Sequence, residues 1–168
     1  LCSSHLQQTC CALLEVTQRC DLLCPVCFAG AHNNGYADPS LHELKFRLNT
    51  VAKKGMNINI QLSGGEPCVR DDLPQIVTLV RSMGFEFVQL NTNGLRISRD
   101  TAFLRKLKAA GLSTVFLQFD GTDDSIYRHI RGKNLFSLKR AAVQQCMEQE
   151  LGVVLVPTLI PGINTGNI

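Results

Sequence analysis

Short apolar runs alternate with amphipathic stretches along the chain from residue 12 onward. The apolar runs predict strands at 12–17, 57–62, 85–91, 114–119 and 152–157. The stretches between them predict helices at 41–54, 71–83, 100–110 and 137–150. Ser40 is the expected N-cap of the first helix, with Glu43 at the capping-box position. Single helices between successive strands require crossover connections, so the pattern predicts a parallel sheet.

Five such strand–helix units are fewer than a closed eight-fold barrel needs. We therefore expect an α/β fold, a partial parallel (β/α) barrel that continues past Ile168. The chain begins at Leu1 rather than at a methionine and ends just after a strand, which favours an internal piece of a longer protein.

Composition narrows the class of protein. The 168 residues are 45% hydrophobic and 18% charged, which is typical of a globular domain. The net charge of +3 comes without any basic run, so no nucleic-acid partner is expected. The longest apolar run, Val153 to Ile160, contains Pro157 and is too short to span a membrane. Eight cysteines in such a chain favour metal-binding thiols in a cytoplasmic enzyme over disulfides.

Three of the cysteines directly follow the first predicted strand, as Cys20, Cys24 and Cys27 in the spacing C-x3-C-x2-C. Thiolates are ligands for iron–sulfur clusters and for zinc. Three of them on a four-iron cluster leave one iron open, whereas structural zinc takes four protein ligands. A zinc site completed by His32 or a distant cysteine therefore stays open, as does an electron-transfer iron–sulfur protein.

Polar and glycine-containing segments end the next four predicted strands. They are Gly64-Gly65-Glu66-Pro67, Asn91-Thr92-Asn93-Gly94, the pair Gln118 and Asp120, and Thr158. Parallel sheets place their binding sites at these strand ends, although each segment alone is also typical of a turn, and Asp120 of a helix N-cap. Arg128, His129 and Arg131 are interpreted as a solvated helix face, with contact to a substrate as the alternative.

The cysteine loop followed by Ser63-Gly-Gly-Glu-Pro67 resembles the signature of radical S-adenosylmethionine (SAM) enzymes. The resemblance implies that Cys20, Cys24 and Cys27 bind a [4Fe–4S] cluster whose fourth iron is chelated by SAM. It implies that Gly64 and Gly65 supply backbone contacts and that Glu66 meets the SAM amino group. The other strand-end residues, Pro67, Asn91, Thr92, Asn93, Gln118, Asp120 and Thr158, are expected to complete the cofactor site. In this superfamily the residue before the third cysteine is commonly aromatic and packs near the adenine of SAM. Here it is Val26, with Phe28 after the cysteine, and the resemblance implies that these two residues lie at the adenine.

The segment before the first strand holds Cys2 and the adjacent Cys10 and Cys11. With the later motifs it resembles the tetraether lipid synthase and tetrahydromethanopterin-methylase-like group. That resemblance implies an auxiliary iron or iron–sulfur centre at Cys2 and Cys10 in segment 1–11, ahead of a core domain at 12–168. It further implies carbon–carbon bond formation or methyl transfer on a lipid or pterin-type substrate, with a ferredoxin- or flavodoxin-type one-electron donor. The alternative is a non-catalytic zinc- or iron–sulfur-binding module.

Overall fold

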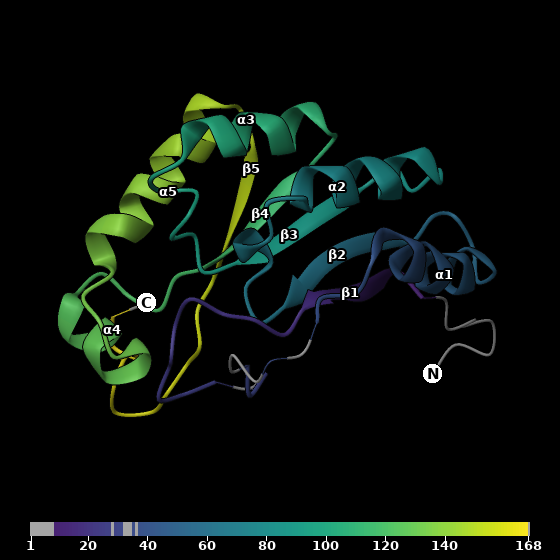
Figure 1. Cartoon of the computed structure of the whole chain (residues 1–168). Helices are drawn as coiled ribbons and strands as arrows, with labels where there is room; N and C mark the ends of the chain where they lie inside the picture. Colours follow the sequence, from purple (N-terminus) through teal and green to yellow (C-terminus); the bar gives the residue numbers. More distant parts are fainter. Residues whose placement is uncertain (1–8, 28, 32–34, 36, 168) are drawn as a thin grey trace, which may run out of the picture.

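The computed structural model describes residues 9–27, 29–31, 35 and 37–167. In this part of the chain one parallel sheet runs in the order β1-β2-β3-β4-β5. Its strands are β1 (Cys11–Thr17), β2 (Asn59–Gly64), β3 (Val88–Thr92), β4 (Thr114–Gln118) and β5 (Gly152–Val156). Figure 1 shows the main helices together on one side of a strongly twisted sheet. The predicted partial parallel barrel is confirmed.

The four predicted helices are present, and the structure adds one short turn and one further helix. They are α1 (Leu41–Ala52), η1 (Pro67–Val69, a single 3₁₀ turn), α2 (Leu73–Ser82), α3 (Thr101–Ala109), α4 (Asp124–Arg131) and α5 (Phe136–Glu148). The capping box of α1 is confirmed, because Ser40 Oγ accepts from the Glu43 amide at 3.2 Å and Glu43 accepts from the Ser40 amide at 2.7 Å. β3 begins at Val88 rather than at residue 85, and Phe85 is buried ahead of it.

The added helix, α4, lies in the segment interpreted as polar and solvated. Its N-cap is Asp123, whose side chain accepts from the Ser125 amide at 2.6 Å, and not Asp120. It ends at Gly132, whose φ of 76° is the left-handed conformation that favours glycine at a helix end. Only Ile126, Tyr127 and Ile130 carry its apolar face, which is too few positions for a periodic signal.

The two faces of the sheet have different chemistry, because strand side chains alternate. Alternate residues pack under the helices and form the main core, among them Val16, Ile60, Leu62, Val88, Leu90, Val115 and Leu117. The residues between them, which include Gln61, Gln89, Asn91 and Gln118, point to the face without helices. This second face, here called the inner face, is therefore largely polar.

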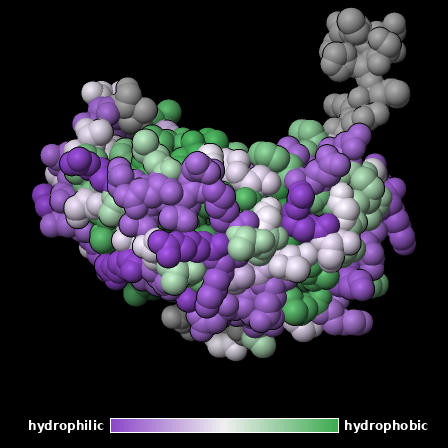
Figure 2. All heavy atoms as spheres, turned by 90° about the horizontal axis from the view of Figure 1, so that it is seen from above, coloured by the Kyte–Doolittle hydropathy of each residue, from purple (hydrophilic) through white to green (hydrophobic). Residues whose placement is uncertain are grey.

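The outer surface is mostly hydrophilic, with separate apolar patches where the molecule is seen from above (Figure 2). The larger exposed apolar residues include Val154, Leu155 and Val156 of β5, which is the last strand of the sheet. Within the described part of the chain, no helix is long and apolar enough to cross a membrane.

Candidate functional site

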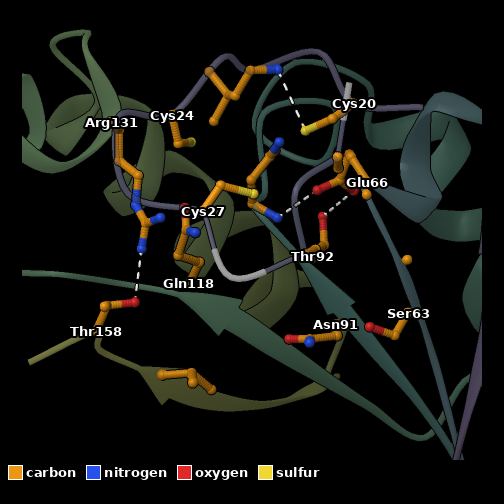
Figure 3. A pocket seen from close by; sticks show the side chains of 17 residues that line it. Cys20, Cys24, Cys27, Ser63, Glu66, Asn91, Thr92, Gln118, Arg131 and Thr158 are labelled. Carbon is orange, nitrogen blue, oxygen red and sulfur yellow. Dashed lines mark hydrogen bonds between the residues drawn. The ribbon is translucent and has the colours of Figure 1, made fainter. Parts of the chain in front are cut away.

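The three cysteines and the ends of β2, β3, β4 and β5 border one pocket at the carboxyl edge of the sheet (Figure 3). Its lining includes Cys20, Cys24, Cys27, Ser63, Gly64, Gly65, Glu66, Asn91, Thr92, Asn93, Gln118, Arg131, Val156 and Thr158. Parallel strands bring their carboxyl ends to the same edge, so segments almost 140 residues apart in the chain (20 to 158) share this space.

The cysteine loop is docked onto the end of β2 by backbone hydrogen bonds. The Gly65 amide donates to Thr17 O at 2.9 Å, and the Glu66 amide donates to Arg19 O at 2.8 Å. A Cβ on Gly64 would lie 2.1 Å from Thr17 O, and one on Gly65 would lie 2.4 Å from Arg19 O. The paired glycines are therefore required for the loop backbone to approach the strand end, besides bordering the pocket.

Glu66 joins the ends of β2 and β3 through its carboxylate. The carboxylate accepts from the Cys68 amide at 2.9 Å, the Thr92 hydroxyl at 2.6 Å and the Asn93 amide at 2.6 Å. Burial raises the pKa of Glu66, and those hydrogen bonds oppose the rise. Among the described residues no cationic side chain forms an ion pair with it. A buried carboxylate facing a pocket without such a partner is suited to receive a cation from a ligand.

The cysteines differ in their surroundings. Burial raises the pKa of Cys20 to about 11, and burial also raises the pKa of Cys24. Cys27 is exposed. In the described part of the chain, no group of three or more His, Cys, Asp or Glu side chains gathers around a single metal-ion position. The proposed fourth zinc ligand, His32, lies outside the described residues.

Two buried cations belong to this region and were missed from the sequence. Lys139 of α5 is fully buried and donates to Asn93 O at 2.5 Å and to Gln118 Oε1 at 3.3 Å. Arg131, interpreted as part of a solvated face, is 4% exposed and borders the pocket, whereas Arg128 and His129 beside it are exposed. The spacing of Tyr127, Ile130 and Arg131 on one side of α4 is the signal that could have found it.

The remaining predicted residues are placed as follows. Asp120 is fully buried beneath the pocket and bonded to Arg131, and Pro67 is buried behind the β2 end, so neither borders the pocket. Val26 is exposed, and its carbonyl accepts from Arg131. Phe28 and Cys2 lie outside the described residues.

The segment ahead of the core shows only its last residues. Cys10 is exposed just before β1. Cys11 belongs to β1, and its thiol lies 4.0 Å from Gln89 Oε1. The auxiliary centre and the boundary at residue 11 stay predictions.

Comparison with known proteins identifies relatives along the whole chain. The chain is 43% identical to the 7,8-dihydro-6-hydroxymethylpterin dimethyltransferase of Methanocaldococcus jannaschii, over 100% of this chain and 34% of that protein. It is 29% identical to a probable GTP 3',8-cyclase of Methanococcus aeolicus, over 92% of this chain and 52% of that protein. The chain thus spans between a third and about half of the length of these two relatives.

A solved structure has the same fold. The structure of anSMEcpe with bound AdoMet, which is SAM, superposes with a TM-score of 0.71 at 19% identity, covering 90% of this chain and 43% of that one. The sequence pattern of the Radical SAM superfamily matches residues 14–168. The chain therefore belongs to the radical SAM superfamily, whose proteins bind a [4Fe–4S] cluster and SAM.

Proposed function

We propose that Cys20, Cys24 and Cys27 hold a [4Fe–4S] cluster at the carboxyl edge of the partial barrel and that SAM lies across the strand ends beside it. The observation that carries this proposal is the single pocket that the three thiols share with the ends of four strands. The polar groups for SAM are Glu66, Asn91, Thr92, Asn93, Gln118 and Thr158, together with the backbone of Gly64 and Gly65.

The donor set fits both groups. Three cysteines of one loop supply three thiolates and leave one iron without a protein ligand. Each thiolate of a cubane binds a different iron, so the three sulfurs need not meet at one point as around zinc. The Glu66 carboxylate uses three of its roughly four acceptor positions within the protein, which leaves one for an ammonium group.

When bound, the cluster and SAM supply reductive cleavage of SAM to methionine and a 5′-deoxyadenosyl radical, which takes a hydrogen atom from an organic substrate. The residues of this chain bind, orient and shield. Glu66 receives the amino group, and Lys139 holds the Asn93 carbonyl and the Gln118 amide in place from below. The strand ends form one wall of the pocket and limit the access of water to it.

For the substrate we propose a pterin-type heterocycle, modified by methyl transfer or carbon–carbon bond formation. The 43% identical relative from M. jannaschii is a pterin dimethyltransferase by name. The inner face of the sheet supports the same class. Gln61 Nε2 donates to Gln89 Oε1 at 3.3 Å, and Asn91 and Gln118 stand on the neighbouring positions towards the pocket. Amide side chains offer a donor and an acceptor each, which suits the edge of a pterin ring better than a lipid tail.

As the source of the electron we propose a donor protein of the ferredoxin or flavodoxin type. Cys27 and Val26 are exposed, and Leu23 of the same loop is 77% exposed. The cluster would therefore lie close to the surface on the side of this loop.

Anaerobic reconstitution of the chain with iron and sulfide tests the proposal. We expect an EPR signal from the reduced cluster that changes when SAM is added, and 5′-deoxyadenosine among the products. Cys24→Ala should lose cluster and product together. Cys146→Ala should keep both, since Cys146 is buried in the core side of α5.

Two results would contradict the proposal. One is a spectrum indifferent to SAM with no 5′-deoxyadenosine formed, and the other is zinc bound stoichiometrically in place of iron. The substrate class is tested separately, by deuterium transfer from a labelled dihydropterin to 5′-deoxyadenosine. Transfer from a labelled lipid instead would overturn the pterin assignment alone.

A further inference from the structure

Arg131 ends α4 with its guanidinium buried against a buried carboxylate. Its Nε donates to Asp120 Oδ2 at 2.7 Å, and one terminal nitrogen donates to Asp120 Oδ1 at 2.9 Å, so the pair is bidentate. Asp120 is 0% exposed and Arg131 is 4% exposed. An ion pair of this kind loses hydration on both sides, and it fixes geometry more reliably than it adds stability.

The remaining donors of Arg131 reach two other segments. One terminal nitrogen donates to the Val26 carbonyl at 3.0 Å, between Cys24 and Cys27. The other donates to Thr158 Oγ1 at 2.9 Å, beyond the end of β5 (Figure 3). The Val26 amide also donates to Ile130 O at 3.4 Å, so α4 holds residue 26 through both of its peptide groups.

Asp120 is held from the far side as well. The Thr158 amide donates to Asp120 Oδ1 at 3.0 Å. The Asn164 side-chain amide donates to Asp120 O at 2.9 Å and to Thr158 O at 2.8 Å. The pair thus joins the end of β4, the end of α4, the segment after β5 and the cysteine loop at a single point.

We propose that the Arg131–Asp120 pair is the clasp that sets the position of Cys24 and Cys27 relative to Cys20. Arg131 is a positioning residue that acts through the Val26 carbonyl. Cys20 is fixed independently, by the docking of residues 17–19 onto the end of β2. The inference depends on the proposed function, in that the three cysteines hold the cluster.

The proposed positioning role requires an arginine side chain. Its planar guanidinium presents five N–H donors in a fixed fork, and here four of its hydrogen bonds reach three different residues. A lysine at this position keeps the charge but offers a single ammonium nitrogen, which cannot reach the carboxylate and the Val26 carbonyl in the same geometry.

Arg131→Lys in the reconstituted chain tests the clasp. Groups that orient metal ligands from behind typically contribute 10–100-fold to metal affinity, so the chelator concentration that removes half of the iron should fall about tenfold. The EPR line shape of the reduced cluster should change as well, because the positions of two ligands shift.

Arg70→Lys is the matched control. Arg70 is also buried, also pairs with an aspartate through two nitrogens, and also donates to two carbonyls, Val16 O at 2.7 Å and Pro39 O at 2.9 Å. It does not border the pocket. Arg70→Lys should lower the free energy of unfolding without changing iron retention or the EPR line shape.

Thr158→Val is a milder second variant, which removes one hydrogen bond and leaves the ion pair in place. Its iron retention should fall between those of wild type and Arg131→Lys. If circular dichroism shows that Arg131→Lys does not fold, Thr158→Val tests the clasp in its place. The clasp is refuted if Arg131→Lys, or Thr158→Val in its place, retains iron like the wild type, or if Arg70→Lys loses iron equally. Iron retention by Cys24→Ala at the wild-type level would refute the proposed function instead.

Discussion

Lys139 is a buried cation beneath the pocket, and its protonation affects stability. Burial and the charge of Arg131 lower the pKa of Lys139 to about 8, whereas the charges of Asp120, Glu66 and Cys24 oppose that shift. In the unfolded chain the pKa is near 10.5. Between these two values the unfolded chain binds a proton that the native protein does not, so stability falls as pH is lowered from 10.5 to 8 and is then constant.

We therefore predict a pH dependence that Lys139→Met abolishes. The difference in free energy of unfolding between wild type and Lys139→Met should shift by about 3 kcal/mol in favour of the wild type from pH 7.5 to pH 10.5. Denaturant titrations of both proteins under reducing conditions measure it. Because the same thiols and tyrosines titrate in both proteins, their contributions cancel. A difference that stays constant with pH would show that Lys139 remains charged in the native protein.

At the scale of residues, the spacing of motifs in the sequence indicates which residues could share a site. The cysteine spacing and Gly-Gly-Glu-Pro identify Cys20, Cys24, Cys27 and Glu66, and all four border one pocket. Lys139 and Arg131 could not be found in this way. Each is a single charged residue on a helix, and only the packing of that helix against the strand ends decides whether it is buried.

At the scale of elements, the docking of the cysteine loop onto β2 yields a second prediction. Gly65→Ala places a Cβ 2.4 Å from Arg19 O. Because Arg19 O is a backbone atom, the loop itself must move to make room. We expect a loss of about 1–3 kcal/mol in free energy of unfolding and a clear loss of reconstituted iron.

Gly166→Ala provides the comparison. A Cβ there meets no atom within 4 Å, and its φ is not in the left-handed range. It should leave both quantities unchanged. Equal iron content in Gly65→Ala and wild type, determined by colorimetric iron assay, would mean that the loop tolerates displacement from β2.

The elements themselves follow the pattern of apolar positions in most cases. The N-terminus of α1 was predictable because the capping box is local, and the parallel direction of the strands because single helices between strands require crossover connections. The buried side of α4 was not predictable, since the polar sequence Asp-Ser-Ile-Tyr-Arg-His-Ile-Arg resembles a solvated helix until Tyr127 and Arg131 are seen packed inward.

At the scale of the whole molecule, we predict that the edge of β5, which pairs with no further strand among the described residues, is an association surface. Leu155 is 49% exposed, and within the described residues β5 pairs with β4 alone. Exposed apolar edge strands promote pairing with other chains. We predict that the 168-residue chain self-associates and that Leu155→Lys weakens this about tenfold, since a buried leucine contributes roughly 1.5–3 kcal/mol.

Sedimentation at several concentrations measures the effect. Phe46→Lys removes an even more exposed apolar side chain from α1, which has no free backbone edge, and should change association little. If Phe46→Lys weakens association as much as Leu155→Lys does, general surface hydrophobicity and not the strand edge is responsible.

The sheet order, which equals the chain order, has a consequence for how the protein is made on the ribosome. Each strand that emerges pairs with the strand completed just before it, so the partial barrel can grow in one direction during synthesis. The cysteine loop is translated directly after β1, whereas its last anchor, Thr158, is translated only after β5. Until α4 and the segment after β5 have left the ribosome, the loop is held only at its β2 side, so cluster insertion into a fully held loop has to wait for both.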